Sequence, residues 1–329
     1  MSMSGPDTIP ESAMTNPPAV DRWDGIGVAV AGLGSMGLGI AASLLRAGAH
    51  VTGFDPGKDR RSAFAELGGE VAVSAGAAAE RADVVVSVVV NAEQTEALLF
   101  GPDGLVERMA PDGVFVSCAT LAPGKARAMA HRLEATGRHY LDAPISGGAQ
   151  RAADGSLTVM ASGSAAAFDR AAHVLDAIAG KVYRLGDAAG QGAAFKMVNQ
   201  LLAGVHIAAA AEAIAFAANE GLDLQRVYEV ITASAGNSWM FQNRVPHMID
   251  GDYTPRSAVD IFVKDLGIVL DMGRSNAFPV PLASAALQLF VMTSAAGMGR
   301  DDDASVARLY ARIAGLHLPG EPAAPTDCP

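Results

Sequence analysis

The chain has 329 residues, half of them hydrophobic, and carries a formal net charge of −11. This length predicts two domains of about 100–200 residues each, and the acidic balance makes nucleic acid an unfavourable partner. A small anionic ligand remains compatible with that charge, because a local basic pocket can override it.

Two cysteines, Cys118 and Cys328, are too few for a disulfide framework, which is typical of a reducing cytoplasm. The seven histidines stand singly, without metal-ligand spacing, so we expect no metal site. The first residues hold no basic stretch followed by an apolar run, so we expect no secretory signal. These features together predict a cytoplasmic protein.

In chain order, residues 1–23 come first, and they are rich in proline, serine and threonine without apolar periodicity. Such a segment cannot bury enough apolar surface to fold, so we expect a disordered arm. Residues 318–329 have a similar composition and predict a flexible tail.

Residues 24–186 predict a doubly wound, Rossmann-type α/β domain. Short β-rich runs alternate there with alanine-rich helical stretches, and most of the runs are continuously apolar, as in a parallel sheet covered on both faces. The predicted strands lie within residues 26–32, 50–55, 84–90, 113–119, 138–144, 155–163 and 180–186.

Residues 187–317 predict an all-helical domain, because the strand pattern gives way to long helical periodicity. The expected helices are the stretch around and after Lys196, then residues 222–236, 257–275, 282–297 and 301–315. Residues 201–218 are apolar enough to suggest a membrane span. They carry His206 and Glu212 and are mostly alanine, so we expect a buried helix and no membrane partner.

A glycine-rich loop follows the first predicted strand and opens the first predicted helix. It consists of Gly32, Gly34 and Gly37 in a GxGxxG pattern, with Ser35 and Met36 between the last two. The first glycine permits the tight turn, the second lets the backbone approach a pyrophosphate, and the third allows close packing of helix on strand. Strand, glycines and helix in this order predict a dinucleotide site.

The next predicted strand ends at Asp55, about 20 residues past the glycines. An acidic residue there binds the ribose hydroxyls and repels a 2′-phosphate, so we expect NAD as the cofactor. Arg60 and Arg61 follow closely and weaken this preference over NADP. The alternative, an ordinary turn residue at the strand end, fits the surrounding pattern less well.

Two polar segments are candidates for substrate chemistry. Ser146, Gly147 and Gly148 follow a predicted strand, where ligands bind in doubly wound sheets, although the segment alone is more typical of a plain glycine-rich turn. Lys196 opens a long apolar helix with Asn199 and Gln200 on its face. Burial would lower the pKa of this lysine and suit it to acid–base work. On spacing alone, a lysine reaching to solvent at a helix end is an equal alternative.

Lys264 and Asp265 form a third candidate in a later helix. Taken alone, they are more typical of a solvated surface ion pair. A second lysine near Lys196 would instead further lower the pKa of that residue and help to hold an anion.

Together these segments resemble the β-hydroxyacid dehydrogenase family, which includes 3-hydroxyisobutyrate dehydrogenase. The resemblance runs from Gly27 to about Gly315 and implies that Lys196 is catalytic. It implies substrate binding by Ser146, Gly147, Gly148, Asn199 and Gln200, the last standing where the family often has a second asparagine. It implies contact with NAD by the glycine loop, Asp55, Thr120 and Lys264, and a pocket bordered by residues 236–239.

The implied activity is NAD-dependent oxidation of a small anionic hydroxy acid by a homodimer or homotetramer. Residues 201–213 and 236–267 resemble the branch that acts on four-carbon sugar acids, so L-threonate, oxidised to its 2-oxo acid, is the expected substrate. Alternatives within the family are 3-hydroxyisobutyrate, D-threonate and the reduction of tartronate semialdehyde. An alternative of another class is a non-catalytic NAD-binding sensor or scaffold.

Overall fold

The computed structural model describes residues 23–320. The expected N-terminal arm, up to residue 22, and most of the expected tail lie outside these residues. Trp23 belongs to the fold, because its side chain is buried and its indole N–H donates to the Ala47 carbonyl over 2.7 Å.

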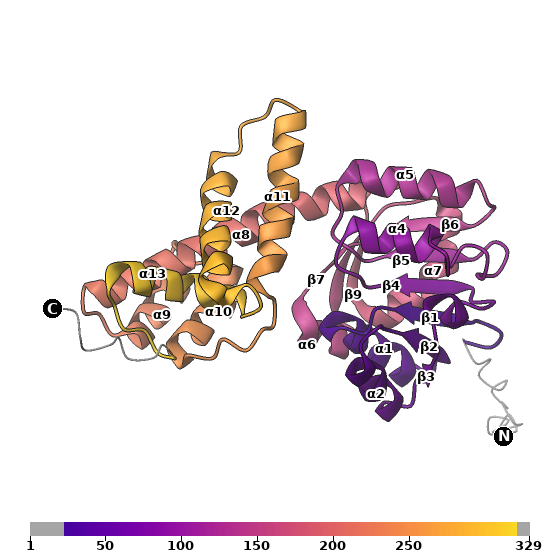
Figure 1. Cartoon of the computed structure of the whole chain (residues 1–329), viewed down its shortest axis with the longest axis horizontal. Coiled ribbons are helices and arrows are strands. Elements are labelled where there is room, and N and C mark those ends of the chain that lie inside the picture. Colours follow the sequence, from indigo (N-terminus) through magenta and orange to yellow (C-terminus); the bar gives the residue numbers. More distant parts are fainter. Residues whose placement is uncertain (1–22, 321–329) are drawn as a thin grey trace, which may run out of the picture.

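The first part of the chain forms a six-stranded, all-parallel sheet in the order β3-β2-β1-β4-β5-β6 (Figure 1). This is the strand order of a Rossmann fold, as predicted. The strands are β1 (Val28–Ala31), β2 (Val51–Phe54), β3 (Glu70–Val71), β4 (Val84–Ser87), β5 (Val114–Ser117) and β6 (His139–Asp142). The two-residue strand β3 was not predicted, because so short a pairing leaves no periodic signal.

Both faces of this sheet are buried, as its continuous apolar strands require. Alternate residues such as Val30 and Val86 join one core with α1 (Ser35–Arg46) and α7 (Ala165–Ile178). Their neighbours, such as Val85 and Phe115, join a second core on the opposite face. Helices α3 (Ala75–Ala78), α4 (Ala92–Phe100) and α5 (Pro123–Glu134) contribute to that second core, and α2 (Lys58–Glu66) packs beside β2 and β3.

A small second sheet extends this part of the molecule. Strand β7 (Ile145–Ser146) pairs antiparallel with β8 (Leu157–Ala161), which pairs parallel with β9 (Ala179–Arg184). Helix α6 (Gly148–Asp154) lies between β7 and β8 in the chain and packs against α1. The strands β8 and β9 were predicted, whereas the two-residue β7 was not.

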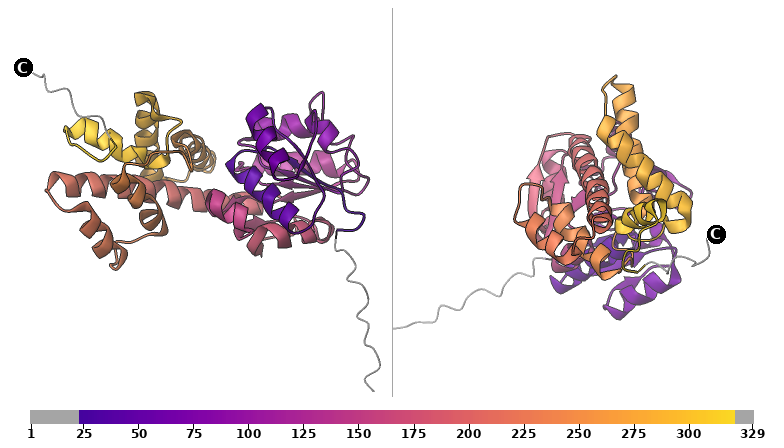
Figure 2. Two further views of the ribbon diagram at one scale, coloured as in Figure 1. Left: turned by 90° about the horizontal axis from the view of Figure 1, so that it is seen from below. Right: turned by 90° about the vertical axis from the view of Figure 1, so that its left-hand side faces the viewer.

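The remaining elements are helical, and α8 (Gln191–Asn219) is the longest. It begins against β6, β8 and α5 and runs on into the helical bundle (Figures 1 and 2). Around it pack α10 (Trp239–Asp250), α11 (Val259–Ser275), α12 (Pro281–Thr293) and α13 (Val306–Ala314), and α9 (Leu224–Thr232) contacts both α8 and α10.

Helix α10 was not predicted, because Pro246 lies inside it and proline normally breaks a helix. Its ends nevertheless carry ordinary signals. The Ser238 hydroxyl accepts a hydrogen bond from the Phe241 N–H at the start, and Gly251 takes a left-handed conformation at the end.

Two helical segments, α8 and Pro281–Met298, are long and apolar enough to cross a membrane by composition alone. Helix α8 packs against two strands and six other α-helices, so it is the core helix that its alanine content predicted. Such a helix passes the same length and hydropathy test as a membrane span.

Candidate active site

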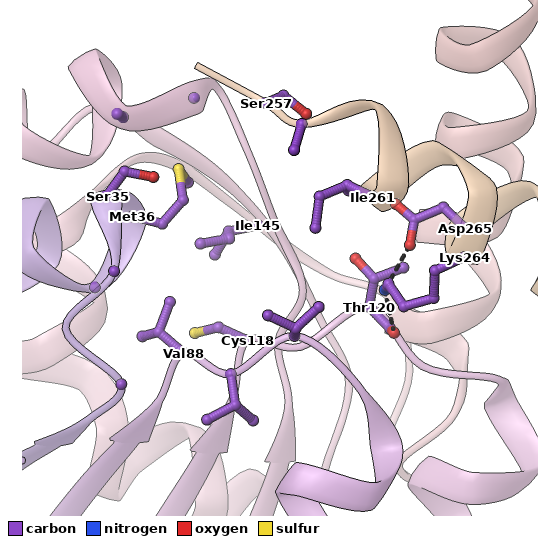
Figure 3. Close-up of a pocket in the computed structure, with 18 of the residues that line it drawn as sticks. Ser35, Met36, Val88, Cys118, Thr120, Ile145, Ser257, Ile261, Lys264 and Asp265 are labelled. Carbon is purple, nitrogen blue, oxygen red and sulfur yellow. Dashed lines mark hydrogen bonds and ion pairs between the residues drawn. The ribbon is translucent and has the colours of Figure 1, made fainter. Parts of the chain in front are cut away.

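A cavity of about 1580 Å³ lies between the parallel sheet and the helical bundle. The segments that follow β1, β4, β5 and β6 line one side of it, and α8, α10 and α11 line the other. Figure 3 shows part of this cavity, with Ile261, Lys264 and Asp265 of α11 on one side and Met36, Val88 and Cys118 on the other. The carboxyl edge of a doubly wound sheet is where ligands bind. All fourteen site residues predicted from the sequence line this one cavity.

The glycine loop has the geometry of a pyrophosphate cradle. Gly32 has a φ of +95°, and a Cβ added there would lie 2.5 Å from the Val88 carbonyl oxygen. A Cβ on Gly37 would collide with the Gly32 carbonyl oxygen. At Gly34 a Cβ would meet only the Arg60 guanidinium, 4.0 Å away, so this backbone is open.

Helix α1 begins at this open point, and no side chain caps its first turn. The N–H groups of a first turn have no partner within the helix and favour an anion. The loop therefore fits the pyrophosphate of a dinucleotide, both in shape and in hydrogen-bonding capacity.

Asp55 lies at the end of β2, and its side chain is almost fully buried. Its carboxylate accepts hydrogen bonds from the Leu33 N–H over 2.9 Å and the Gly57 N–H over 2.8 Å. The Arg60 guanidinium lies 3.3 Å from the same carboxylate. Asp55 thus ties the glycine loop to β2 and puts a negative charge where the ribose of a dinucleotide would lie.

Lys196 lies in the second turn of α8, and only 7% of it is exposed. Its ammonium group donates a hydrogen bond to the Ile145 carbonyl over 2.7 Å. Burial lowers the pKa of Lys196 to about 8, since removal from water disfavours the charged amine. The negative charge of Asp265 opposes this shift and the positive charge of Lys264 adds to it.

A hydrogen-bonded chain connects the other polar residues beside Lys196. Lys264 forms an ion pair with Asp265 over 2.6 Å, and its ammonium group lies 3.4 Å from the Thr120 carbonyl (Figure 3). The other Asp265 oxygen accepts from the Gln200 amide over 2.5 Å, and Gln200 accepts from the Asn199 amide over 2.9 Å. The view of Lys264 and Asp265 as a solvated surface pair is wrong, because Asp265 is 1% exposed.

The start of α8 is held by the sheet. One oxygen of the buried Asp142 carboxylate, at the end of β6, accepts from the N–H groups of Gly190 and Ala193, each over 2.8 Å. The Ser162 hydroxyl accepts from the Gly192 N–H over 2.9 Å. These bonds fix the helical turn that carries Lys196.

Ser146, Gly147 and Gly148 connect β7 to α6 on the sheet side of the cavity. Both glycines have positive φ values, +137° and +78°, so the segment needs glycine for its backbone path. Of residues 236–239, Trp239 lines the cavity and the other three do not.

Several cavity residues were not found from the sequence, among them Asn243, Arg244, Ser257 and Arg300. Asn243 and Arg244 lie in α10, the helix that was not predicted because of its internal proline. Ser257 and Arg300 show no motif, because tertiary folding alone brings them to the cavity.

Comparison with known proteins agrees with this geometry. A profile described as the NAD binding domain of 6-phosphogluconate dehydrogenase matches residues 27–186. A second, described as NAD-binding of NADP-dependent 3-hydroxyisobutyrate dehydrogenase, matches residues 190–310. The L-threonate dehydrogenase of Cupriavidus necator is 54% identical over 294 residues, which cover 89% of this chain and 98% of that protein.

The chain belongs to the β-hydroxyacid dehydrogenase family. A 3-hydroxyisobutyrate dehydrogenase from Pseudomonas aeruginosa is 34% identical and covers 86% of this chain and 98% of its own. A solved structure titled 3-hydroxyisobutyrate dehydrogenase, from Salmonella typhimurium, aligns with a TM-score of 0.82 at 49% identity, over 86% of this chain and 99% of that one. The predicted family, the Rossmann-type fold and the NAD cofactor are confirmed.

This member of the family is an NAD-dependent oxidoreductase that acts on a small hydroxy acid. The family finding also argues against the alternative of a non-catalytic sensor. The roles of the fourteen individual site residues stay predictions.

Proposed function

We propose that the protein oxidises L-threonate at C2 to its 2-oxo acid, with Lys196 as the group that accepts the hydroxyl proton. The observation that carries the proposal is the burial of Lys196 in the interdomain cavity, where its pKa falls to about 8. A base with a pKa near the working pH is efficient, because a large share of it is neutral. The relatives named L-threonate dehydrogenase support the choice of substrate.

The chain would hold NAD along the sheet side of the cavity. The open N–H groups after Gly34 would bind the pyrophosphate, with Ser35 and Met36 in the same turn and Asp55 at the ribose. Lys264 lies near Lys196, and its ammonium group is 3.4 Å from the Thr120 carbonyl. Bound there, NAD supplies the acceptor for the hydride that leaves the substrate carbon.

The substrate carboxylate would bind Ser146 and the N–H groups of Gly147 and Gly148, with Lys264 adding positive charge. Asn199 lies one helical turn from Lys196, so both side chains can contact the reacting hydroxyl. Gln200 already donates to Asp265 and accepts from Asn199. Its contribution to substrate binding would then be to orient the Asn199 amide.

The substitution Lys196→Ala tests the proposed base. We expect turnover to fall by about 10²–10⁴-fold, the usual range for loss of a general base. NAD affinity, measured by titration calorimetry, should persist, because the glycine loop is untouched. The exposed Lys181 on β9 provides a control, and Lys181→Ala should keep normal turnover. Near-normal turnover of Lys196→Ala would show that another group takes the proton.

A panel of hydroxy acids, followed by NADH absorbance, tests the substrate. L-Threonate should give the highest kcat/KM, above D-threonate and 3-hydroxyisobutyrate, and tartronate semialdehyde is assayed in the reductive direction. A higher kcat/KM with 3-hydroxyisobutyrate would replace L-threonate as the substrate and leave the role of Lys196 intact. That outcome has some support from relatives that carry the name 3-hydroxyisobutyrate dehydrogenase.

The protein is further proposed to work in the cytoplasm as a homodimer or homotetramer. Apolar side chains of α8 and α12 that stay exposed in a single chain support self-association. The low cysteine content supports a reducing compartment.

A further inference from the structure

A buried ion pair contributes to the helical side of the cavity. Arg244, on α10, contacts the Asp303 carboxylate through Nε over 2.5 Å and through Nη2 over 3.0 Å. Asp303 is fully buried, and the Arg244 side chain is nine-tenths buried where it lines the cavity. The remaining nitrogen, Nη1, donates to the side-chain oxygen of Asn243, another cavity residue.

A buried ion pair of this kind does not by itself indicate that it stabilises the fold. Desolvating two charges costs several kcal/mol each, and apolar residues of the same volume often serve a core as well or better. A buried pair placed on a cavity wall instead gives that wall fixed polar groups. The Asn243 side-chain oxygen is occupied by Arg244, so Asn243 keeps its amide N–H groups as donors, and Arg244 has N–H groups beyond those that bind Asp303 and Asn243.

Ser257 continues this polar surface just ahead of α11. Its hydroxyl belongs to the cavity lining and can both donate and accept a hydrogen bond. Its backbone is fixed, since its carbonyl accepts from the Asp303 N–H over 2.8 Å and the Asp302 carboxylate holds the Arg256 N–H over 2.9 Å. The backbone of Ser257 is therefore held in place before any ligand arrives.

Apolar side chains dominate other parts of the same cavity. Figure 3 shows Ser257 next to Ile261 at one side, with Cys118 and Ile145 across the space. A substrate hydroxyl turned toward those residues would lose its hydrogen bonds with water and gain none. Asn243, Arg244 and Ser257 offer donors and an acceptor together, as a hydroxyl group requires.

We propose that Asn243, Arg244 and Ser257 form a hydroxyl-recognition wall for the end of the substrate distant from its carboxylate. The wall selects acids with hydroxyl groups beyond the reacting carbon over acids with an alkyl chain. This inference rests on the proposed function, because it assumes a hydroxy acid whose C2 hydroxyl faces Lys196. It adds three specificity-determining residues to that site.

The test compares two substrates that differ only beyond C2: L-threonate and the 2-hydroxybutyrate of the same C2 configuration. The wild-type enzyme should favour L-threonate by about 100-fold or more in kcat/KM, since two hydrogen-bonded hydroxyls, one of them on a charged donor, supply that discrimination. The variant Ser257→Ala should lower this ratio about tenfold, whereas Ser257→Thr, which keeps a hydroxyl, should retain most of it.

A double variant, Arg244→Met with Asp303→Leu, removes both charges and leaves neither buried alone. Its ratio of kcat/KM for L-threonate to kcat/KM for 2-hydroxybutyrate should approach one. The control is Ser275→Ala, at the last residue of α11 and outside the cavity, where the hydroxyl donates to the Asp271 carbonyl. That variant should keep the wild-type ratio.

The outcomes separate the inference from the proposed function. A wild-type ratio near one, or equal losses on both substrates in Ser257→Ala, overturns the hydroxyl-recognition wall and leaves L-threonate oxidation in place. No oxidation of either substrate by the wild-type enzyme overturns the proposed function, and this inference with it.

Discussion

Lys196 lies in a balance of three influences on its pKa. Burial favours the neutral amine most strongly, Asp265 favours the charged form, and Lys264 again favours the neutral form. The net result is a pKa of about 8, below the ordinary 10.5 of a lysine. The proposed base is therefore partly neutral at physiological pH and still has positive charge nearby to hold an anionic substrate.

The pH dependence of oxidation follows from this balance. A protonated Lys196 cannot accept the hydroxyl proton, so kcat/KM should rise with pH and level off above about 8. The substitution Lys264→Met removes a positive neighbour, so the rise of kcat/KM should move to higher pH. Removing a negative neighbour in Asp265→Asn should move it to lower pH. The measurement is log kcat/KM against pH, with Lys181→Met as the control whose profile should not shift. A shift of Lys264→Met and Asp265→Asn in the same direction would contradict this account of the pKa of Lys196.

For individual residues, the sequence predicted which side chains line the cavity better than it predicted which side chains contact one another. Lys196, Asn199 and Gln200 share a helix face by their spacing alone, which the structure confirms. The burial of Asp265 was not predictable, because adjacent lysine and aspartate in a helix usually form a solvated pair. Asp302 and Asp303 are a similar case, since three successive aspartates are typical of an exposed helix start and these two are fully buried.

Helix α8 connects the two parts of the site. Its first turn is anchored to Asp142 at the end of β6 and to Ser162 just after β8, and its later turns form the centre of the helical bundle. Lys196 is thereby placed relative to the cofactor side by the sheet and relative to Lys264 by the bundle. A long, rigid element of this kind keeps catalytic geometry better than a loop would.

The hydrogen bonds from the start of α8 to Asp142 can be compared by mutation with those of an ordinary helix cap. Asp142→Ala leaves the Gly190 and Ala193 N–H groups without partners, so the free energy of unfolding should fall by about 1–3 kcal/mol. Turnover should fall about tenfold or more, because Lys196 loses its fixed position. The control Asp223→Ala removes the cap of α9, which carries no site residue. It should cost about 1 kcal/mol and leave turnover intact.

Urea unfolding and steady-state kinetics give both quantities. Normal turnover in a destabilised Asp142→Ala would show that the anchor serves stability alone. Equal kinetic losses in both variants would mean that any loosening of the helical bundle disturbs the site.

Element prediction succeeded where the signal was periodic and long. The seven predicted strands and the helices after Lys196 lie where expected, within a few residues. The failures are local: β3 and β7 have two residues each, and α10 contains a proline. Because α10 was not predicted, Arg244 was not recognised as a cavity residue either.

In a single chain, a stripe of apolar side chains along α8 stays exposed to solvent. Phe195, Val198 and Leu202 follow one another at helical spacing, and Phe216 lies about four turns further along the helix. Val198 and Phe216 are more than 60% exposed. A stable interface usually needs a large patch of this kind. The stripe begins beside Lys196 and Asn199, so a second chain seated on it would also support the turn that carries them.

The stripe should therefore be an interface between copies of the chain. Light scattering coupled to size exclusion should give a dimer or tetramer for the wild type, and Leu202→Glu with Phe216→Glu should give a monomer, because two carboxylates cannot be buried unpaired. Val73→Glu, a charge added to an exposed valine of the sheet domain, should keep the oligomer. Turnover of the monomer should fall, since α8 loses its support beside Lys196. A wild-type monomer, or an oligomer that survives both glutamates, would place the contact elsewhere or remove it.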